Sequence, residues 1–483
     1  MKRKLKKDEK EAVVKLPGQD LSGTEILGAK QNIRKMGITT ETATTATGMG
    51  AANGGAADVE SKQILSLEVF QELFKHVEPD VEIDTFELAQ GSDRGDNYTA
   101  ALYRINLSGK RQSLDGSQHK WTQSVICKVM PESVAQREAY KSDKLFRNEV
   151  EFYTTIMPEL LKFQASKTGR DSPVFNAIPK CYTARHDLLI MEDLRERGFQ
   201  MSDRHKGLSI EETQSVLLQV AQLHGLSLAY KFEHPLDFAK LCSLISEGIF
   251  CTANTSWYRN YYERLTKNAV KMVSEVLPAD SKYVLAMRNF AESSSFFGQM
   301  VKIASSESPL SAICHGDCWV NNFLYHYDPE DPQLVLEVAL IDFQLIRYSS
   351  IALDIANLLY CCTTKEMRDA ELKSLLKTYT EELFRWLKIL CTELPEHCNT
   401  LEKLQKLFAE ELKAYGRFAL GLAMDIIPIS TCSSEDAPDM YLNRNDEPEE
   451  EDEGAPTLNF PPNDLCRQKM VEIVKDMVDG DML

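Results

Sequence analysis

The chain has 483 residues, of which 43% are hydrophobic and 27% are charged, a composition typical of a globular protein with a substantial core. Its net charge of −18 argues against general binding to nucleic acid, because phosphates repel an acidic surface. No stretch is long and apolar enough to predict a membrane span, and no apolar run follows the basic N-terminus as in a secretory signal. We expect a cytoplasmic protein whose twelve cysteines are reduced.

The first segment, residues 1–62, has the composition of a disordered tail. Six of its first ten residues are Lys or Arg, and a Thr/Ala/Gly-rich stretch with few bulky apolar residues follows. Such a segment cannot bury enough surface to offset the entropy lost on ordering. The basic start also matches a nuclear-import signal, which leaves a nuclear location open as an alternative.

Hydrophobic spacing then predicts a small α+β part followed by a mainly helical part. A helix from Leu65 leads to strands within 83–107 and 120–130, and a helix over 136–161 precedes a strand over 188–191. The helices expected after this point span 210–230, 256–276, 282–303, 370–390, 400–422 and 464–478, with a strand region at 334–346.

This order of elements predicts an α+β protein with two lobes. We expect a small β-rich amino lobe over 63–191, a hinge over 192–195 and a larger helical carboxyl lobe over 196–483. Within the carboxyl lobe, residues 433–457 are expected to form a solvated acidic loop, because their like charges repel one another.

The strongest functional pattern is His315-Gly-Asp317 with Asn322 five residues after the aspartate, followed by Asp342 another twenty residues on. Phosphoryl transfer needs one carboxylate that orients the attacking hydroxyl and accepts its proton. Asp317 fits this role. Asn322 and Asp342 fit the role of magnesium ligands, because magnesium favours one or two carboxylates together with water and phosphate oxygens. A single acid would more often be a loop cap, but the complete set points to a kinase.

The pattern resembles that of the aminoglycoside/choline-kinase-like phosphotransferases and, more narrowly, the ecdysteroid-kinase-like (CHK kinase-like) family. The resemblance covers roughly residues 65–480. The segments that carry it are Asp96-Asn97-Tyr98, Val125 to Pro131, Phe146 to Tyr153, Met191 to Leu194, Leu223-His224, His315 to Asn322 and Asp342-Phe343-Gln344. It implies a protein-kinase-like two-lobed fold and an ATP- and magnesium-dependent kinase that phosphorylates a hydroxyl group of a small molecule.

The resemblance also implies roles for residues of the amino lobe. Lys128 would contact the α- and β-phosphates and pair with an acid on the next helix. Helical spacing leaves Glu149 and Glu151 as candidates for that acid, and the resemblance favours Glu149. Gly95 and Asn97 would lie nearest the nucleotide, in a glycine turn that is a weak motif by itself and is equally compatible with an ordinary hairpin.

Other residues receive binding or structural roles. Glu192, Asp193 and Leu194 would form the hinge, where adenine pairs with backbone groups. His315 and Asp354 would brace the loop of Asp317, and His224 is expected to be a core residue. Gln344 stands where protein kinases have a glycine after Asp-Phe, and the segment up to Asp354 is too short for an activation loop, so a protein substrate is not expected.

For the acceptor, the resemblance suggests an ecdysteroid-type sterol hydroxyl or another lipophilic alcohol. Trp257 and Tyr261 lie four residues apart on one helix face, and Trp319 lies beside Asp317, so these three are expected to line the pocket. The alternative for the face of Trp257 and Tyr261 is packing against the lobe. A choline- or aminoglycoside-type kinase and a silent pseudokinase that binds partners are the alternative functions. We expect a monomer.

Overall fold

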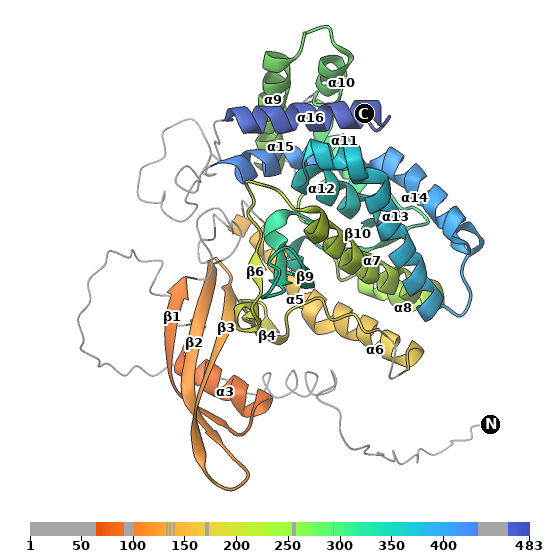
Figure 1. Cartoon of the computed structure of the whole chain (residues 1–483). Helices are drawn as coiled ribbons and strands as arrows, with labels where there is room; N and C mark the ends of the chain where they lie inside the picture. The colour runs from red at the N-terminus through yellow and green to blue at the C-terminus, as the bar shows by residue number, and fades with distance from the viewer. Residues whose placement is uncertain are drawn as a thin grey trace, which may run out of the picture. The chain divides into compact units, whose positions relative to one another are not determined.

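The computed structural model describes residues 64–90, 101–131, 134, 137–138, 141–169, 173–253, 257–292, 294–432 and 462–483, all within one compact unit, residues 54–483 (Figure 1). The predicted tail, the glycine turn with Gly95 and Asn97, and the acidic loop 433–457 fall outside the described residues. The boundaries between tail, lobes and hinge therefore stay predictions.

A five-stranded antiparallel sheet forms the first part of the described fold, with strand order β1-β2-β3-β5-β4. The strands are β1 (Val81–Gln90), β2 (Ala101–Gln112), β3 (Gln118–Val129), β4 (Cys181–Arg185) and β5 (Leu188–Glu192). Helix α3 (Leu67–Val77) packs on one face, where Phe70 and Phe74 share a buried cluster with Val125 and Cys127 of β3. Because side chains alternate along a strand, Lys128 points to the opposite face.

The predicted helix over 136–161 is interrupted in the structure. Helix α5 (Ser142–Glu151) begins after Lys141, whose φ of 54° is left-handed, and passes into a π-helical segment, Phe152–Ile156, before α6 (Met157–Lys167). Left-handed backbone at a non-glycine residue is incompatible with a continuing helix. The prediction was therefore wrong about the continuity and the regularity of this helix.

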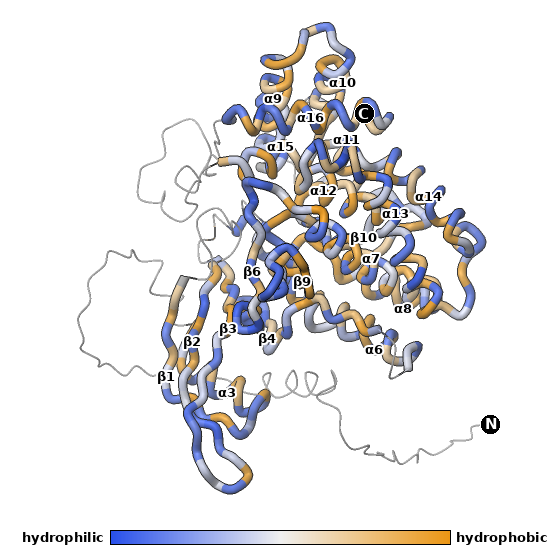
Figure 2. Tube along the Cα trace, in the orientation of Figure 1, coloured by the Kyte–Doolittle hydropathy of each residue, from blue (hydrophilic) through white to orange (hydrophobic). Residues whose placement is uncertain are grey.

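The second part of the chain is mainly helical. Its helices are α7 (Ile210–Glu233), α8 (Pro235–Cys242), α9 (Trp257–Val276), α10 (Lys282–Phe290), α11 (Phe296–Ala304), α12 (Ala352–Cys362), α13 (Lys365–Leu390), α14 (Leu401–Tyr415), α15 (Phe418–Thr431) and α16 (Asp464–Asp479). Figure 2 shows hydrophobic and hydrophilic segments alternating along α13 and α14, as expected for helices with one buried face. The small antiparallel sheet and the helical second part confirm the α+β prediction and are compatible with a kinase-like fold.

Two predicted helices are each divided in two. The region 282–303 contains α10 and α11, because the hydroxyls of Ser294 and Ser295 bond to Glu292 and favour a turn over a continuing helix. The region 400–422 divides at Gly416, a residue type that disfavours helix interiors.

Two short ribbons lie between the helices and were predicted only as a strand region at 334–346. One pairs β7 (Ser311–Cys314) with β10 (Arg347–Ser350). The other joins β6 (Gln200–Met201), β8 (Phe323–Tyr327) and β9 (Val335–Leu340). Their hydrophobic runs are too short for periodicity to distinguish strand from loop.

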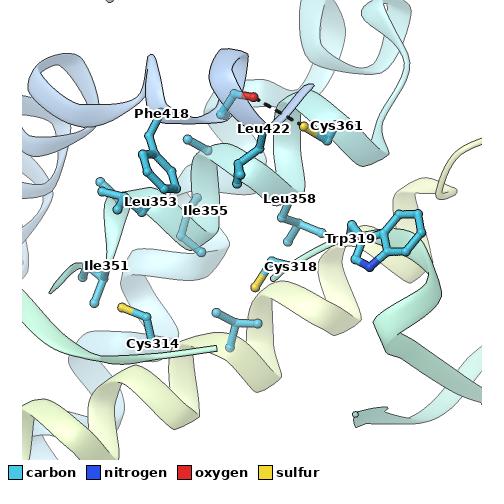
Figure 3. Close-up of a cluster of buried hydrophobic side chains, with 14 of the residues drawn as sticks. Cys314, Cys318, Trp319, Ile351, Leu353, Ile355, Leu358, Cys361, Phe418 and Leu422 are labelled. Carbon is cyan, nitrogen blue, oxygen red and sulfur yellow. Dashed lines mark hydrogen bonds between the residues drawn. The ribbon is translucent and has the colours of Figure 1, made fainter. Parts of the chain in front are cut away.

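A buried layer supports these ribbons. Phe418 and Leu422 of α15 belong to the same buried cluster as Leu353 and Leu358 of α12, and Cys318 lies near Leu358 (Figure 3). The Cys361 thiol also donates a hydrogen bond to the carbonyl of Ala419, at 3.7 Å between Sγ and O. Residues Cys318 to Val320 of the functional pattern belong to the same buried cluster as this layer.

The close packing of α7 against α13 predicts an unusual outcome for a glycine substitution. Glycine in a helix interior usually costs about 1 kcal/mol relative to alanine. A Cβ at Gly225, however, would lie 2.8 Å from Cβ of Trp386, whereas nothing lies within 4 Å of a Cβ at Gly298 of α11. We expect Gly225→Ala to lower the melting temperature and Gly298→Ala to leave it unchanged or raise it. Equal effects in thermal denaturation would contradict this account of the helix pair.

Candidate active site

The two ribbons bring together the residues of the pattern around Asp317. In the ribbon of β8 and β9, Phe323 pairs with Leu340, so Asn322 and Ile341 lie side by side and the Ile341 N–H donates to the Asn322 carbonyl at 3.1 Å. Asp342 follows directly. In the other ribbon, Cys314 pairs with Arg347, which places the loop after β7 beside the segment that follows Asp342. Residues twenty or more positions apart therefore meet through strand pairing.

The loop after β7 is fixed by Gly316 and Asp354. Gly316 has a φ of 87°, and a Cβ there would lie 1.7 Å from the Leu345 carbonyl oxygen, so no other residue fits. Asp354, in the first turn of α12, accepts hydrogen bonds from the backbone N–H groups of His315 (2.7 Å) and Gly316 (3.0 Å). The close approach of Gly316 was missed at the sequence level, although a glycine between two polar site residues is the pattern that could have revealed it.

Hydrogen bonds also fix the two histidines. Nδ1 of His315 accepts from the Asp317 N–H, so Nε2 carries the proton and donates to the Ile341 carbonyl at 3.0 Å. Nε2 of His224 lies 3.1 Å from Asp354, and its Nδ1 lies 2.7 Å from the hydroxyl of Tyr379. Burial lowers the pKa of His315, which keeps this imidazole neutral. His224, Asp354 and Cys314 lie close enough to hold a metal ion, but their hydrogen bonds explain the cluster without one.

Lys128 lies between two carboxylates from different parts of the chain. Its Nζ is 2.5 Å from Oε2 of Glu149 on α5 and 2.6 Å from Oδ1 of Asp342. Burial opposes the charged ammonium, but Asp342 and Glu149 outweigh this effect and raise the pKa of Lys128. Burial also raises the pKa of Glu149, despite the opposing charge of Lys128. Glu151, the other candidate partner, instead accepts a hydrogen bond from Thr155 on its own helical segment.

Asp342 adopts a left-handed conformation, with φ 64° and ψ 67°, which is unfavourable for a non-glycine residue. Besides Lys128, the Gln344 amide holds its carboxylate at 3.1 Å. Phe343 stacks on Phe152 of the π-helical segment, with ring centroids 3.7 Å apart. These contacts on both sides keep Asp342 in the strained conformation and direct its half-buried carboxylate toward Lys128.

Asp317 and Asn322 are joined directly. The Asn322 amide nitrogen donates to both the carbonyl and Oδ2 of Asp317, each at 2.9 Å. Burial, followed by the charge of Asp342, raises the pKa of Asp317 to about 7, and Asp425 adds to the increase. A carboxylate with a pKa near neutrality is suited to accept a proton from a substrate.

Asn148, next to Glu149, holds three segments together. Its side chain exchanges two hydrogen bonds with the backbone of Ser246, at 2.8 and 2.9 Å, and donates a third to the Gln344 carbonyl at 3.0 Å. The residue is fully buried. Asn148 thus fixes α5 relative to the segment after Asp342. Sequence reasoning missed this residue, although it lies within the Phe146-Arg-Asn-Glu149 segment.

The side chains at the predicted hinge are engaged in the fold. Asp193 is buried and accepts hydrogen bonds from Arg104 (2.6 Å) and Ser124 (2.7 Å), which tie β2 and β3 to the segment after β5. Glu192 accepts from the Lys180 N–H at 3.1 Å. Leu194 is buried beside partly exposed Leu324 and Ile341. The acidic side chains of this segment are therefore engaged in hydrogen bonds within the fold.

The predicted pocket residues near Asp317 are more buried than expected. Tyr261 is 3% exposed, and its hydroxyl donates to Asp425 of α15 at 2.5 Å. The expectation that the Tyr261 ring forms an open pocket wall is therefore wrong, because the ring packs within the helical core. Trp319 is 8% exposed, and its backbone N–H donates to the Asp317 carbonyl at 2.9 Å. The side chain of Trp257 lies outside the described residues.

With this geometry established, the chain can be compared with known proteins. It matches the ecdysteroid kinase-like family over residues 94–392, which is more than half of its length. The chain belongs to this family. The match spans all the residues from Lys128 to Asp354 that meet in the site, and it identifies a protein of a small-molecule kinase-like phosphotransferase family. No curated protein matches the chain.

Two general features accompany the family assignment. Within the part of the chain that the structure describes, none of the helices combines the length and hydrophobicity needed to cross a bilayer. All twelve cysteines are described, and none of them forms a disulfide. Burial raises the pKa of several thiols near the site, including Cys314 and Cys318, so these cysteines are protonated core residues.

The bonds of Asn148 predict a large loss of stability on truncation. Asn148→Ala would leave the Ser246 N–H and the Gln344 carbonyl without this partner, at a cost of about 1–3 kcal/mol for each buried group. Asn357 of α12 is a matched control, because its buried amide has no hydrogen-bond partner among the described residues. We expect urea denaturation to show a much larger loss for Asn148→Ala than for Asn357→Ala. A loss of stability for Asn148→Ala no larger than that for Asn357→Ala would contradict the role of Asn148 in joining these segments.

The raised pKa of Asp317 predicts a pH-dependent effect on stability. The folded chain holds this proton up to about pH 7, whereas the unfolded chain releases it near pH 4, so ionisation destabilises the fold as pH rises through this window. Asp317→Asn should therefore raise the melting temperature by roughly 4 °C above pH 7. The difference should vanish near pH 4. The exposed Glu330→Gln serves as control, and a pH-independent difference for Asp317→Asn would refute the assignment.

Proposed function

We propose that the chain is an ATP- and magnesium-dependent kinase that transfers the γ-phosphoryl group to a hydroxyl of a small molecule. The observation that carries this proposal is the ion pair of Lys128 with Asp342, beside the linked pair of Asp317 and Asn322. Phosphoryl transfer requires three kinds of group: a cation for the phosphates, oxygen ligands for a metal, and a carboxylate that can accept a proton.

The proposal includes the two-lobed protein-kinase-like fold, with residues 63–191 as amino lobe, 192–195 as hinge and 196–483 as carboxyl lobe. Lys128 and Glu149 belong to the amino lobe, and Asp317, Asn322 and Asp342 to the carboxyl lobe. Lys128 therefore links the two lobes through its ion pair with Asp342, and both lobes would contact the same nucleotide.

The residues present fit a magnesium ion. Asp342 supplies a half-buried carboxylate, and the Asn322 amide oxygen has no hydrogen-bond partner among the described residues, since only the nitrogen is used by Asp317. One carboxylate and one neutral oxygen leave the rest of a magnesium shell to water and phosphate. When bound, magnesium would neutralise charge on the phosphates.

Each residue then has a defined task. Lys128 would contact the α- and β-phosphates while Glu149 holds its ammonium in place. Asp317 would orient the acceptor hydroxyl and take up its proton as the hydroxyl oxygen bonds to the γ-phosphorus and the bond to ADP breaks. Asn322 keeps the Asp317 carboxylate oriented. The raised pKa of Asp317 favours uptake of the proton near neutral pH.

Adenine would bind at the hinge, through the backbone of Glu192 to Leu194 and the apolar surface of Leu324 and Ile341. Gly95 and Asn97 would cover the phosphates. His315 and Asp354 would fix the catalytic loop through the hydrogen bonds described above.

The acceptor could be an ecdysteroid-like sterol or a choline- or aminoglycoside-type compound, and a pseudokinase acting as an interaction protein is the alternative from another class. The ion pair of Lys128 with Asp342 favours the enzyme, because a protein that only binds partners has no need of a buried lysine between two carboxylates.

Magnesium should affect wild type and an Asp342 variant differently. We expect ATP to raise the melting temperature of the wild-type chain, and magnesium to increase this shift, because the metal joins the phosphates to Asp342. Asp342→Asn should remove the magnesium-dependent increase, whereas the exposed Asp331→Asn should retain it. Equal magnesium dependence in all three proteins would show that Asp342 is not a metal ligand.

A further inference from the structure

The segment 246–250 lies between α8 and α9 and forms neither a helix nor a strand, yet it is firmly anchored. Phe250 at its end is 1% exposed. The ring centre of Phe250 lies 4.9 Å from that of Tyr262 of α9 and 5.4 Å from that of Phe418 of α15. The segment is therefore held in the helical part of the protein, and it keeps a fixed position relative to the elements that it contacts.

Glu247 fixes the middle of this segment. Its carboxylate accepts hydrogen bonds from the backbone N–H groups of Ile249 (3.1 Å) and Phe250 (3.0 Å). It also accepts from the buried guanidinium of Arg347, through Nε (3.1 Å) and Nη2 (3.4 Å), a strong and directional contact. Arg347 lies in β10, which pairs with β7, the strand that leads into the loop of Asp317. Glu247 thus ties the segment to the ribbon that carries this loop.

On its other side, the segment contacts α5 beside Glu149. The Asn148 side chain exchanges two hydrogen bonds with the backbone of Ser246, at 2.8 and 2.9 Å. A Cβ at Gly248 would lie 2.3 Å from Cδ2 of Leu145, which is buried, so the segment and the helix touch without a gap. Asn148 and Leu145 lie one and four positions before Glu149 on the same helix. The segment therefore determines where α5 presents the Glu149 carboxylate.

The segment occupies a place that other kinases give to a different element. In protein kinases, the activation loop controls whether the helix that carries the glutamate of the lysine pair is in place. In this chain, the 3₁₀ turn Phe343–Leu345 and β10 follow Asp342 directly and lead into α12, so these described residues contain no such loop. The Asn148 amide that contacts the segment also donates to the Gln344 carbonyl at 3.0 Å. One side chain thus joins the segment, α5 and the residues after Asp342.

We propose that the segment 246–250 takes the place of an activation loop. It holds α5 where Glu149 keeps the ammonium of Lys128 in position for the phosphates of the nucleotide. Glu247 is the positioning residue that fixes the segment, because its carboxylate is engaged by Arg347 and by backbone N–H groups and so acts through the segment. This inference rests on the proposed kinase function and adds a determinant of nucleotide binding that lies outside the predicted site residues.

The test is a double-mutant cycle on the dissociation constant of ATP with magnesium, measured by calorimetry for Glu247→Gln, Glu149→Gln and the double variant. Glu247→Gln keeps the size of the side chain and removes the charge that holds Arg347. It should weaken ATP binding about tenfold, because Lys128 loses part of its support. In the Glu149→Gln background the same change should have little further effect, because the contact through which it acts is already broken.

Asp476→Asn is a matched control. Asp476 pairs with Arg368 at 2.7 Å, and the two side chains are buried to a similar degree as Glu247 and Arg347. This pair joins α13 to α16, and neither of its residues forms a hydrogen bond or an ion pair with α5. Asp476→Asn should leave ATP binding unchanged. Equal weakening of ATP binding by Glu247→Gln and Asp476→Asn would show an effect of general stability and would overturn the proposal.

Hydrogen exchange in the ligand-free protein decides the inference independently of the kinase proposal. The amides of residues 142–151 should exchange about tenfold faster in Glu247→Gln than in the wild type or in Asp476→Asn, because α5 has lost its support. Unchanged exchange in α5, or effects on ATP binding that simply add in the cycle, would overturn the proposal. If the wild type binds no ATP, the proposed function fails, and the exchange rates still decide whether Glu247 positions α5.

Discussion

The buried ammonium of Lys128 is the contact on which the arrangement of the site depends. It comes from the small sheet and meets Glu149 of α5 and Asp342 after β9. A buried charge without partners would cost several kcal/mol, so the three elements are stable only when they meet. The position of α5, the left-handed backbone of Asp342 and the stacking of Phe343 on Phe152 all accompany this one interaction.

A second set of contacts fixes the position of Asp317 relative to that ion pair. The β8–β9 hairpin places Asn322 beside the residue before Asp342, and Asp354 holds the backbone of His315 and Gly316 from below. These are backbone and hairpin contacts, which are more rigid than paired long side chains. The proposed base and metal ligands therefore belong to one rigid unit, and Lys128 connects that unit to the sheet.

Much of this site could be predicted from the sequence because its residues occur in short local patterns. The spacing of His315, Asp317 and Asn322 lies within one loop, and the family resemblance linked them to Lys128 and Glu149. The predictions were wrong where long-range packing decides the outcome. Nothing in the local pattern shows that Lys141 turns left-handed, or that the ring of Tyr261 is buried while its hydroxyl reaches Asp425.

The most direct measurement is transfer of labelled γ-phosphate from ATP to a hydroxylated small molecule, followed by mass spectrometry of the product. The account predicts a phosphate ester with the wild-type chain and a rate about 10²–10⁴ lower with Asp317→Asn, while ATP binding is retained. Transfer at the wild-type rate by Asp317→Asn would contradict the assignment of the base. Binding of ATP without transfer to any ecdysteroid, choline or aminoglycoside would contradict the central claim and favour the pseudokinase.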